Sequence, residues 1–358
     1  MAVQQDLGES PRVLIVRPSA LGDVCRTVPA LVTLRAAMPR AHIAWLVNEH
    51  YADAVRHHPD LDEVRTFPRH QFGRTLKTGR LVGAAIRWVR NLRSQKYDVA
   101  IDLQGLFRSG LITWLSGARR RIGFANGREL SWLAYNRRHK VDTRLHTVDR
   151  MLGLLAAAGC EPRHNMRLHL GPDDHRWLDE FLAQGVAADA SYACLAPTAQ
   201  WLCKCWPIGK YIELARKMLE TQIAGPRLVL VSAPSERDQV KPLLDALSKW
   251  RDRVLFPQTT VGQLLALVSR ARVLVCNDSA PLHVAIGFDR PIVSVFGPTD
   301  PALVGPYGRP DAVVRPPGHE APGAVNYRAH RDDQTLISQV SVESVWENLE
   351  AQVGGVRR

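Results

Sequence analysis

Short apolar runs alternate along the chain with longer segments in which apolar residues recur every three or four positions. The run RVLIVR at residues 12–17 is typical of a buried strand, and the apolar residues within 24–37 have a helical period. Further strands are predicted at residues 42–47, 64–67, 99–103, 192–196, 228–231, 254–256, 273–276 and 291–296. Strands that alternate with helices at this interval predict parallel sheets with helices on both faces.

A polar, turn-rich stretch at residues 159–172 interrupts this alternation, which then begins again. The chain of 358 residues also exceeds the ~250 residues at which single hydrophobic cores stop growing. We therefore predict an α/β protein with two doubly wound, Rossmann-like domains, residues 1–170 and 171–335, whose strand ends face a central cleft. An amphipathic segment predicts a last helix within residues 336–358.

Composition places the chain among ordinary globular proteins, with 46% apolar and 23% charged residues. The first residues lack the pattern of a signal peptide, and no apolar run approaches the ~18 residues of a membrane span, so a cytoplasmic location is predicted. Only Cys203 and Cys205 among the six cysteines are close in sequence, which favours free thiols over a metal site. P-loop and GxGxxG motifs are missing, so no cofactor or metal is predicted.

The net charge of +12 is unevenly distributed along the chain. Residues 1–170 hold 27 Lys and Arg against 14 Asp and Glu, whereas residues 171–358 hold 20 against 21. This asymmetry suggests that the first half meets nucleic acid, lipid headgroups or a phosphorylated substrate, although a merely solvated basic face explains it as well. No nucleic-acid-binding motif accompanies the charge, so nucleic acid is the least favoured partner.

Asp23 follows the first predicted strand and a turn of small residues, at the start of a predicted helix. The helix dipole favours a negative side chain in the first turn and keeps it ionised. An ionised carboxylate at the carboxyl end of a strand is a credible general base. Acidic residues are nevertheless common in first helical turns without any role in chemistry.

A second strand, turn and helix start follow one another in VLVCNDSAPLH, at residues 273–283. Asp278 and Ser279 can cap the helix, and the unpaired N–H groups of a helix start suit a phosphate oxyanion. His283 follows one turn later. Each residue alone can be explained as a cap or a buried histidine, but together they favour a ligand site.

Two more residues follow strands in the second half of the chain. Lys204 lies in the loop after the strand at residues 192–196, from which a lysine can reach a diphosphate as a mobile point charge. Glu236 follows the strand at residues 228–231 and can accept hydrogen bonds from a ribose. A surface lysine and an ordinary first-turn glutamate are the alternatives.

These segments, taken together, resemble a known family. RPSALGDVCRTVPAL, IDLQGLFRSG, RRRIGFA, the Lys204-x-Trp206-Pro207 loop, NDSAPLH and FGPTDP are similar to the motifs of the lipopolysaccharide heptosyltransferases of glycosyltransferase family 9, and occur in the same order. The early motifs most resemble the type that adds the first heptose. The resemblance implies a GT-B fold with an N-terminal acceptor domain, a C-terminal donor domain and a last helix that crosses back to the first domain.

The resemblance also implies a role for each candidate residue. Asp23 matches the aspartate that deprotonates the acceptor hydroxyl in an inverting transfer of heptose from ADP-heptose to the Kdo-lipid A inner core. The positions that match donor contacts are Thr198, Lys204, Glu236, Asp278, Ser279, Ala280 and His283, with Ala280 where a glycine is often found.

The acceptor of this family lies on the inner face of the cytoplasmic membrane, so the resemblance predicts a peripheral enzyme. The phosphorylated acceptor is then the anionic partner that the positive charge of the first half would bind. Ser19, Gly22, Arg108, Arg120 and Arg138 are the predicted acceptor-binding residues. A GT-B sugar-nucleotide epimerase, a transferase of another ADP-sugar to another acceptor, and a non-enzymatic binder of anionic surfaces are the alternatives.

Overall fold

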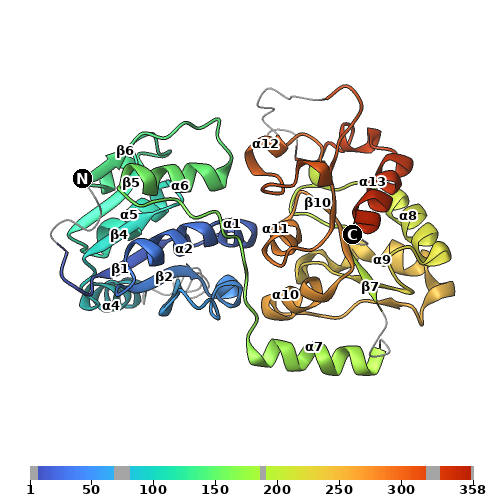
Figure 1. Cartoon of the computed structure of the whole chain (residues 1–358), viewed down its shortest axis with the longest axis horizontal. Helices are drawn as coiled ribbons and strands as arrows, with labels where there is room; N and C mark the ends of the chain where they lie inside the picture. Colours follow the sequence, from blue (N-terminus) through green and yellow to red (C-terminus); the bar gives the residue numbers. More distant parts are fainter. Residues whose placement is uncertain (1–6, 68–80, 186–190, 320–330, 356–358) are drawn as a thin grey trace. The chain divides into compact units, whose positions relative to one another are not determined.

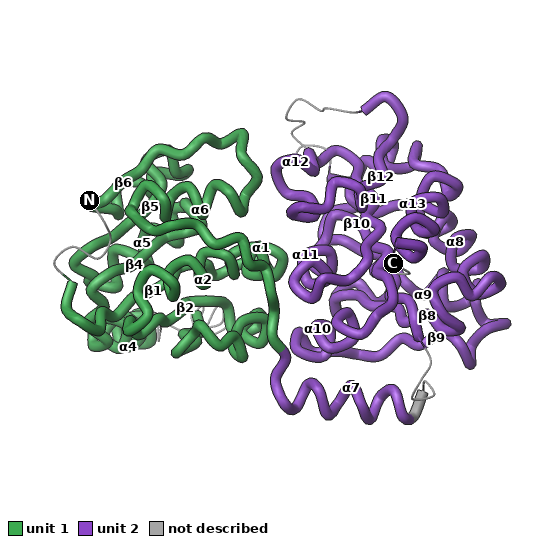
Figure 2. Tube along the Cα trace, in the orientation of Figure 1, with its two compact units in different colours: residues 1–169 green, residues 170–358 purple. Residues whose placement is uncertain are grey.

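The computed structural model describes residues 7–67, 81–185, 191–319 and 331–355. The chain divides into two compact units, residues 1–169 and 170–358 (Figure 2). The boundary predicted from the turn-rich stretch falls one residue after this division. Each unit is built on one six-stranded parallel sheet (Figure 1).

The sheet of the first unit has the strand order β3-β2-β1-β4-β5-β6, with all neighbours parallel. Its buried residues alternate between two faces: Leu14 and Val16 of β1 pack with Ile112 of α5 in one core, whereas Val13 and Ile15 point to the other face. Helices α4 and α5 cover the first of these faces, and α2 and α6, which pack on each other, cover the second (Figure 1). The bounds are β1 Arg12–Val16, β2 His42–Asn48, β3 Glu63–Phe67, β4 Val99–Asp102, β5 Arg120–Phe124, β6 Arg137–His139, α2 Val28–Ala37, α4 Leu81–Ser94, α5 Phe107–Leu115 and α6 Thr147–Ala157.

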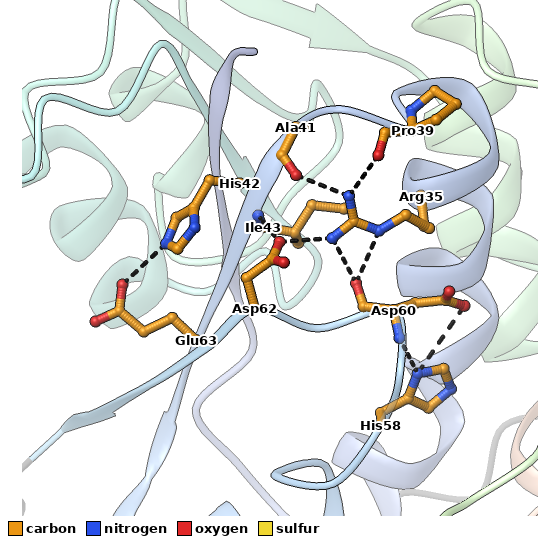
Figure 3. Close-up of polar contacts among 9 residues, drawn as sticks. All are labelled: Arg35, Pro39, Ala41, His42, Ile43, His58, Asp60, Asp62 and Glu63. Atoms are coloured by element: carbon orange, nitrogen blue, oxygen red, sulfur yellow. Dashed lines mark hydrogen bonds and ion pairs between the residues drawn. The ribbon is translucent and has the colours of Figure 1, made fainter.

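The crossover from β2 to β3 is fixed by one arginine (Figure 3). The guanidinium of Arg35 donates to the carbonyl oxygen of Ala41 at 2.7 Å and to that of Asp60 at 3.1 Å. It also pairs with Asp62 at 2.5 Å, and Asp62 in turn accepts the backbone N–H of Ile43 at 2.7 Å. These bonds join α2 to the starts of both strands.

The sheet of the second unit has the order β12-β11-β10-β7-β8-β9, again with all neighbours parallel. One core holds alternate residues of its strands together with α8, α9 and α13, and α10 and α11 pack on each other over the opposite face, with α7 against α10. The bounds are β7 Tyr192–Ala196, β8 Arg227–Leu230, β9 Val254–Leu255, β10 Val273–Asn277, β11 Ile292–Val295, β12 Val313–Val314, α7 Pro172–Gly185, α8 Ile208–Thr221, α9 Arg237–Ala246, α10 Val261–Arg270, α11 Ala280–Gly287, α12 Pro301–Val304 and α13 Val342–Gly354.

The last helix, α13, packs on the core of the second unit. Val345 and Leu349 of α13 are fully buried in the core of the second unit, and Nζ of Lys217 on α8 lies 4.1 Å from the ring centre of Trp346. That residues 336–358 cross back to the N-terminal domain stays a prediction, whereas the apolar face of this helix packs within the second unit.

Other predictions differ locally from the structure. The helix predicted through residue 37 is broken at Thr27 into α1 (Leu21–Arg26) and α2, since Pro29 has no N–H for an intrahelical bond. Residues 120–124 and 137–139 form β5 and β6, which were not predicted as strands because arginines interrupt their apolar pattern. The six cysteines are buried and free, as predicted.

Candidate active site

Both sheets place a topological switch point at the same position. Read from β9, the second sheet has the order β9-β8-β7-β10-β11-β12, which repeats the order of the first. The order in which strands are added to the sheet therefore reverses between β1 and β4 in one unit and between β7 and β10 in the other, while the strands stay parallel. Open parallel sheets bind ligands at the carboxyl ends of such strands. The residues predicted to carry the chemistry follow β1, β7 and β10.

Asp23 lies in the first turn of α1, after the loop that leaves β1. Its Oδ1 pairs with Nη2 of Arg17 at 3.1 Å and with the guanidinium of Arg26, one turn further along the helix. Its Oδ2 accepts the backbone N–H of Ala20 at 3.3 Å. Both arginines are nearly buried, whereas 29% of the Asp23 side chain is exposed, so the carboxylate is held in place but remains accessible.

These contacts determine the charge of Asp23. Burial raises the pKa of a carboxyl group, but the guanidiniums of Arg17 and Arg26 outweigh it and hold the pKa of Asp23 well below its usual range. Asp23 is thus ionised at neutral pH. A carboxylate stabilised in this way is a weak base, which accepts a proton only from a group that has itself become acidic.

More positive charge gathers at this edge of the sheet than the sequence indicated. Arg150 of α6 is half-buried, and among the described residues its Nε has no hydrogen-bond partner. Burial lowers the pKa of Arg150, and the neighbouring charges of Arg128 and Arg17 lower it further. Arg128 is held at the edge by its backbone N–H, which donates to the carbonyl oxygen of Gly105 at 2.9 Å. The arrangement suits an anionic group of a ligand.

The structure separates the predicted acceptor residues. Ser19 and Gly22 flank Asp23, and Arg108 is exposed in the first turn of α5, which also starts at the carboxyl edge. Arg120 begins β5 and therefore lies at the opposite, amino edge of the sheet, away from Asp23. Arg138, in β6, lies over the ring of Trp132, 5.7 Å from its centre. Only the first three share the edge that carries Asp23, so Arg120 is not supported as an acceptor contact.

Asp102, at the carboxyl end of β4, was not singled out from the sequence. Its side chain is fully buried and accepts N–H groups of Gln104 and Gly105 at 2.8 and 3.0 Å and the hydroxyl of Tyr135 at 2.6 Å. Burial raises its pKa despite these bonds. Gly123 makes the contact possible, because a Cβ at that position would overlap the Tyr135 ring. Asp102 fixes the turn before α5, and its place at a strand end was the available signal.

Lys204 and Asp278 meet at the carboxyl edge of the second sheet, 74 residues apart in sequence. Nζ of Lys204 lies 2.6 Å from Oδ2 of Asp278, and the side chains are 13% and 8% exposed. Ser279 is the N-cap of α11, and its side chain does not cap the helix. Of the first three helical residues, Pro281 has no N–H and Leu282 donates to the carbonyl oxygen of Ser279 at 3.2 Å, which leaves the N–H of Ala280. A lysine and a helix start thus occur together, which is an arrangement that can bind a diphosphate.

The remaining donor candidates surround this pair in the fold. Thr198 is buried in the loop after β7, and His283 is buried on α11. Glu236 ends the short 3-10 turn before α9, and its charge reaches Cys205 in the Lys204 loop, where burial and that charge help to raise the thiol pKa to about 11. Asn277, which the prediction overlooked, accepts the backbone N–H of Trp206 at 3.0 Å and so ties this loop to β10.

The Lys204 loop is also held from its other side. Gln334 donates to the carbonyl oxygen of Cys205 at 3.0 Å, and Nε1 of Trp206 donates to that of Val340 at 3.0 Å. The loop is therefore fixed by residues far away in sequence, which no local pattern could reveal. In the described part of the chain, no three His, Cys, Asp or Glu side chains are grouped so as to hold a metal ion.

Two tandem Rossmann-type units, one with an accessible carboxylate and the other with a lysine and a helix start at the switch point, have the architecture of a GT-B glycosyltransferase. The sequence profile of glycosyltransferase family 9 (heptosyltransferase) matches residues 85–327, more than half of the chain. The chain therefore belongs to glycosyltransferase family 9, the heptosyltransferases.

Individual relatives agree with this assignment. Lipopolysaccharide heptosyltransferase 1 of Escherichia coli O18:K1:H7 is 30% identical over 318 residues, which cover 86% of this chain and 93% of the relative. The enzyme of the same name from Pseudomonas aeruginosa is 30% identical and covers 83% and 82%. Among solved structures, the E. coli heptosyltransferase WaaC with ADP is similar, with a TM-score of 0.75, 27% identity and coverage of 95% and 99%.

Proposed function

We propose that this protein transfers L-glycero-D-manno-heptose from ADP-heptose to the Kdo-lipid A inner core, with inversion at the anomeric carbon, in lipopolysaccharide biosynthesis. Its family and the named activity of its relatives support the reaction class. The single observation that carries the mechanism is Asp23, an ionised and accessible carboxylate held between two arginines at a sheet switch point.

Asp23 acts as the general base in this proposal. The acceptor hydroxyl attacks the anomeric carbon while ADP leaves from the opposite face, and the hydroxyl becomes acidic as its oxygen bonds to carbon. The proton then passes to the Asp23 carboxylate late in the step, which agrees with the lowered pKa of that group. Arg17 and Arg26 keep the carboxylate oriented and ionised until that moment.

The leaving diphosphate is stabilised by the second unit. Lys204 turns from Asp278 to the phosphate oxygens, and the N–H of Ala280 at the start of α11 donates to them. Asp278 is then released to accept hydrogen bonds from the heptose hydroxyls, with Thr198 and His283 beside it. We expect no cofactor, since a lysine and a helix start can meet the growing charge.

The acceptor binds at the carboxyl edge of the first unit. We assign the anionic groups of the Kdo-lipid A acceptor to the cluster of Arg128 and Arg150, with Arg108 nearby, in place of Arg120. A lipid-linked acceptor requires the enzyme to work at the inner face of the cytoplasmic membrane, as a peripheral protein. None of the helices in the described part of the chain is both long and apolar enough to cross a membrane.

The test is an incubation of the purified protein with ADP-heptose, other ADP-sugars and UDP-sugars, each with and without a Kdo-bearing lipid A acceptor. Mass spectrometry should show the acceptor heavier by one heptosyl residue, together with ADP, only when ADP-heptose and acceptor are both present. A rearranged free sugar with UDP would indicate an epimerase, and product from a different ADP-sugar alone would replace the donor assignment.

A further inference from the structure

Five large apolar side chains of the first unit are exposed next to one another in the fold. Phe107, Leu111 and Trp114 follow one side of α5, at positions i, i+4 and i+7, and are 57%, 41% and 51% exposed. Leu130 and Leu133, in and beside the short 3-10 turn η2 (Ser131–Ala134), are 61% and 65% exposed. We call these five residues the α5 patch. Single exposed apolar residues are common, but grouped ones mark an interaction surface.

The two segments of the patch pack against each other. A Cβ on Gly110 of α5 would lie 3.0 Å from the carbonyl oxygen of Ser131, and the backbone N–H of Phe107 donates to Glu129 at 3.2 Å. Glu129 and Leu130 both have positive φ, +53° and +59°, a backbone conformation that leucine rarely adopts. The turn thus holds an exposed leucine in a strained conformation, which stability alone does not favour.

Arginines border the patch on two sides. On one side α4 lies beside α5, with Arg93 donating to the carbonyl oxygen of Leu115 at 3.1 Å, and carries exposed Arg87 and Arg90. On the other side Arg128 and Arg138 flank η2. Residues 81–145, which supply the patch and its borders, hold 13 Lys and Arg against 4 Asp and Glu, a net charge of +9.

We propose that the α5 patch docks the protein on an anionic phospholipid bilayer, with the apolar side chains in the headgroup and acyl boundary and the arginines on the lipid phosphates. An apolar stripe with an aromatic residue and basic borders has the composition of an interfacial membrane surface. A second copy of the chain fits less well, because two such surfaces would bring like charges together.

The position of the patch explains why a bilayer is useful here. The first residue of α5 and Leu130 both follow the carboxyl ends of strands, β4 and β5, and this edge also carries Asp23. A lipid-linked acceptor would therefore reach the base without leaving the membrane. This rationale rests on the proposed function, whereas the docking itself does not.

The experiment is sedimentation of the full-length protein with vesicles of equimolar phosphatidylglycerol and phosphatidylcholine, and with vesicles of phosphatidylcholine alone. The wild type should bind the anionic vesicles, less tightly as salt is raised, and the neutral ones far more weakly. Leu111→Ser/Trp114→Ser/Leu133→Ser should weaken binding about 10²-fold, through loss of three inserted apolar side chains. Leu145→Ser, which removes a 43% exposed leucine outside the patch, should leave binding unchanged.

A second variant covers the case in which the triple variant does not fold. Arg87→Gln/Arg90→Gln changes two exposed side chains of α4 and should weaken anionic-vesicle binding roughly fivefold per charge and reduce its salt dependence. Equal binding by wild type and either variant, or no vesicle binding by the wild type, would overturn the proposal. So would a wild-type dimer in vesicle-free solution that the triple variant loses, since the patch would then join two copies.

Transfer to a deacylated, water-soluble acceptor separates this proposal from the proposed function. The triple variant should transfer to that acceptor at the wild-type rate but lose transfer to acceptor embedded in vesicles. A wild type that binds vesicles but transfers heptose to neither acceptor would refute the function and leave the docking surface standing.

Discussion

Replacing Lys204 by methionine tests the donor site most sharply, because the lysine has two tasks that can be measured separately. In the free protein its Nζ lies 2.6 Å from Asp278, where Coulomb's law with an effective dielectric constant of about 20 gives roughly 6 kcal/mol of attraction. Desolvation of two nearly buried groups offsets most of this. Removal of one partner, however, leaves Asp278 buried and unpaired, at a cost of about 3 to 5 kcal/mol.

We therefore expect Lys204→Met to lower the melting temperature by about 10 °C, which is what such a loss means for a unit of this size. Lys204→Met/Asp278→Asn should regain most of the stability, since no unpaired charge remains. The second task is donor binding. Loss of one charge-assisted hydrogen bond, about 1.5 to 3 kcal/mol, should weaken ADP binding 10- to 100-fold in both variants.

Lys210, in the first turn of α8 after the Lys204 loop, provides a matched control. Its Nζ donates to the carbonyl oxygens of Ser338 and Val340 at 2.7 and 2.6 Å, so it holds structure without facing the donor pair. Lys210→Met should lower the melting temperature while calorimetry finds ADP affinity unchanged. If Lys204→Met binds ADP as tightly as the wild type, or both lysine variants lose affinity equally, the diphosphate role of Lys204 is wrong.

Three further predictions concern the first unit. The stability that Asp23 contributes is present above its unfolded pKa, near 4, and is lost as the pH falls through its lowered folded pKa. The difference in unfolding free energy between wild type and Asp23→Asn, measured by urea titration, should therefore be constant at neutral pH and shrink below about pH 4. Arg150→Met should raise the KM for the acceptor about tenfold with little change in kcat. Arg120→Met, at the opposite edge of the sheet, should have the KM and kcat of the wild type. An equal rise in KM in both variants would refute the placement of the acceptor. Gly123→Ala should lower the unfolding free energy by about 1 to 3 kcal/mol, because its Cβ would displace Tyr135 from Asp102, and an unchanged melting temperature would contradict this packing.

The periodicity of the sequence was sufficient to predict the fold class. Buried strands such as β1 and β10 are continuous apolar runs, and helices such as α8 have a clear helical period, so both Rossmann-type units could be predicted. β5 and β6 could not, because they lie towards one end of the sheet and their arginines point to solvent or to backbone carbonyls. The charged residues therefore prevented the prediction of two strands, of which β5 is hydrogen-bonded to β4 and β6 to β5.

The candidate site could likewise be predicted only in part from the sequence. Asp23, Lys204 and Asp278 could be identified because each follows a strand at a helix start or loop. The partners that set their chemistry, such as Arg17, Arg26 and Arg150, could not, since ion pairing depends on which elements the fold brings together. The family resemblance supplied the roles of single residues, but it did not indicate that the apolar face of the last helix packs on its own unit.

The most direct test of the central claim is the single-turnover rate of heptosyl transfer by Asp23→Asn, measured with saturating ADP-heptose and acceptor and compared with wild type. The account predicts a rate about 10³-fold lower, with the affinities for ADP-heptose and acceptor retained, because the amide cannot take up the proton of the attacking hydroxyl. Transfer by Asp23→Asn at the wild-type rate would contradict it.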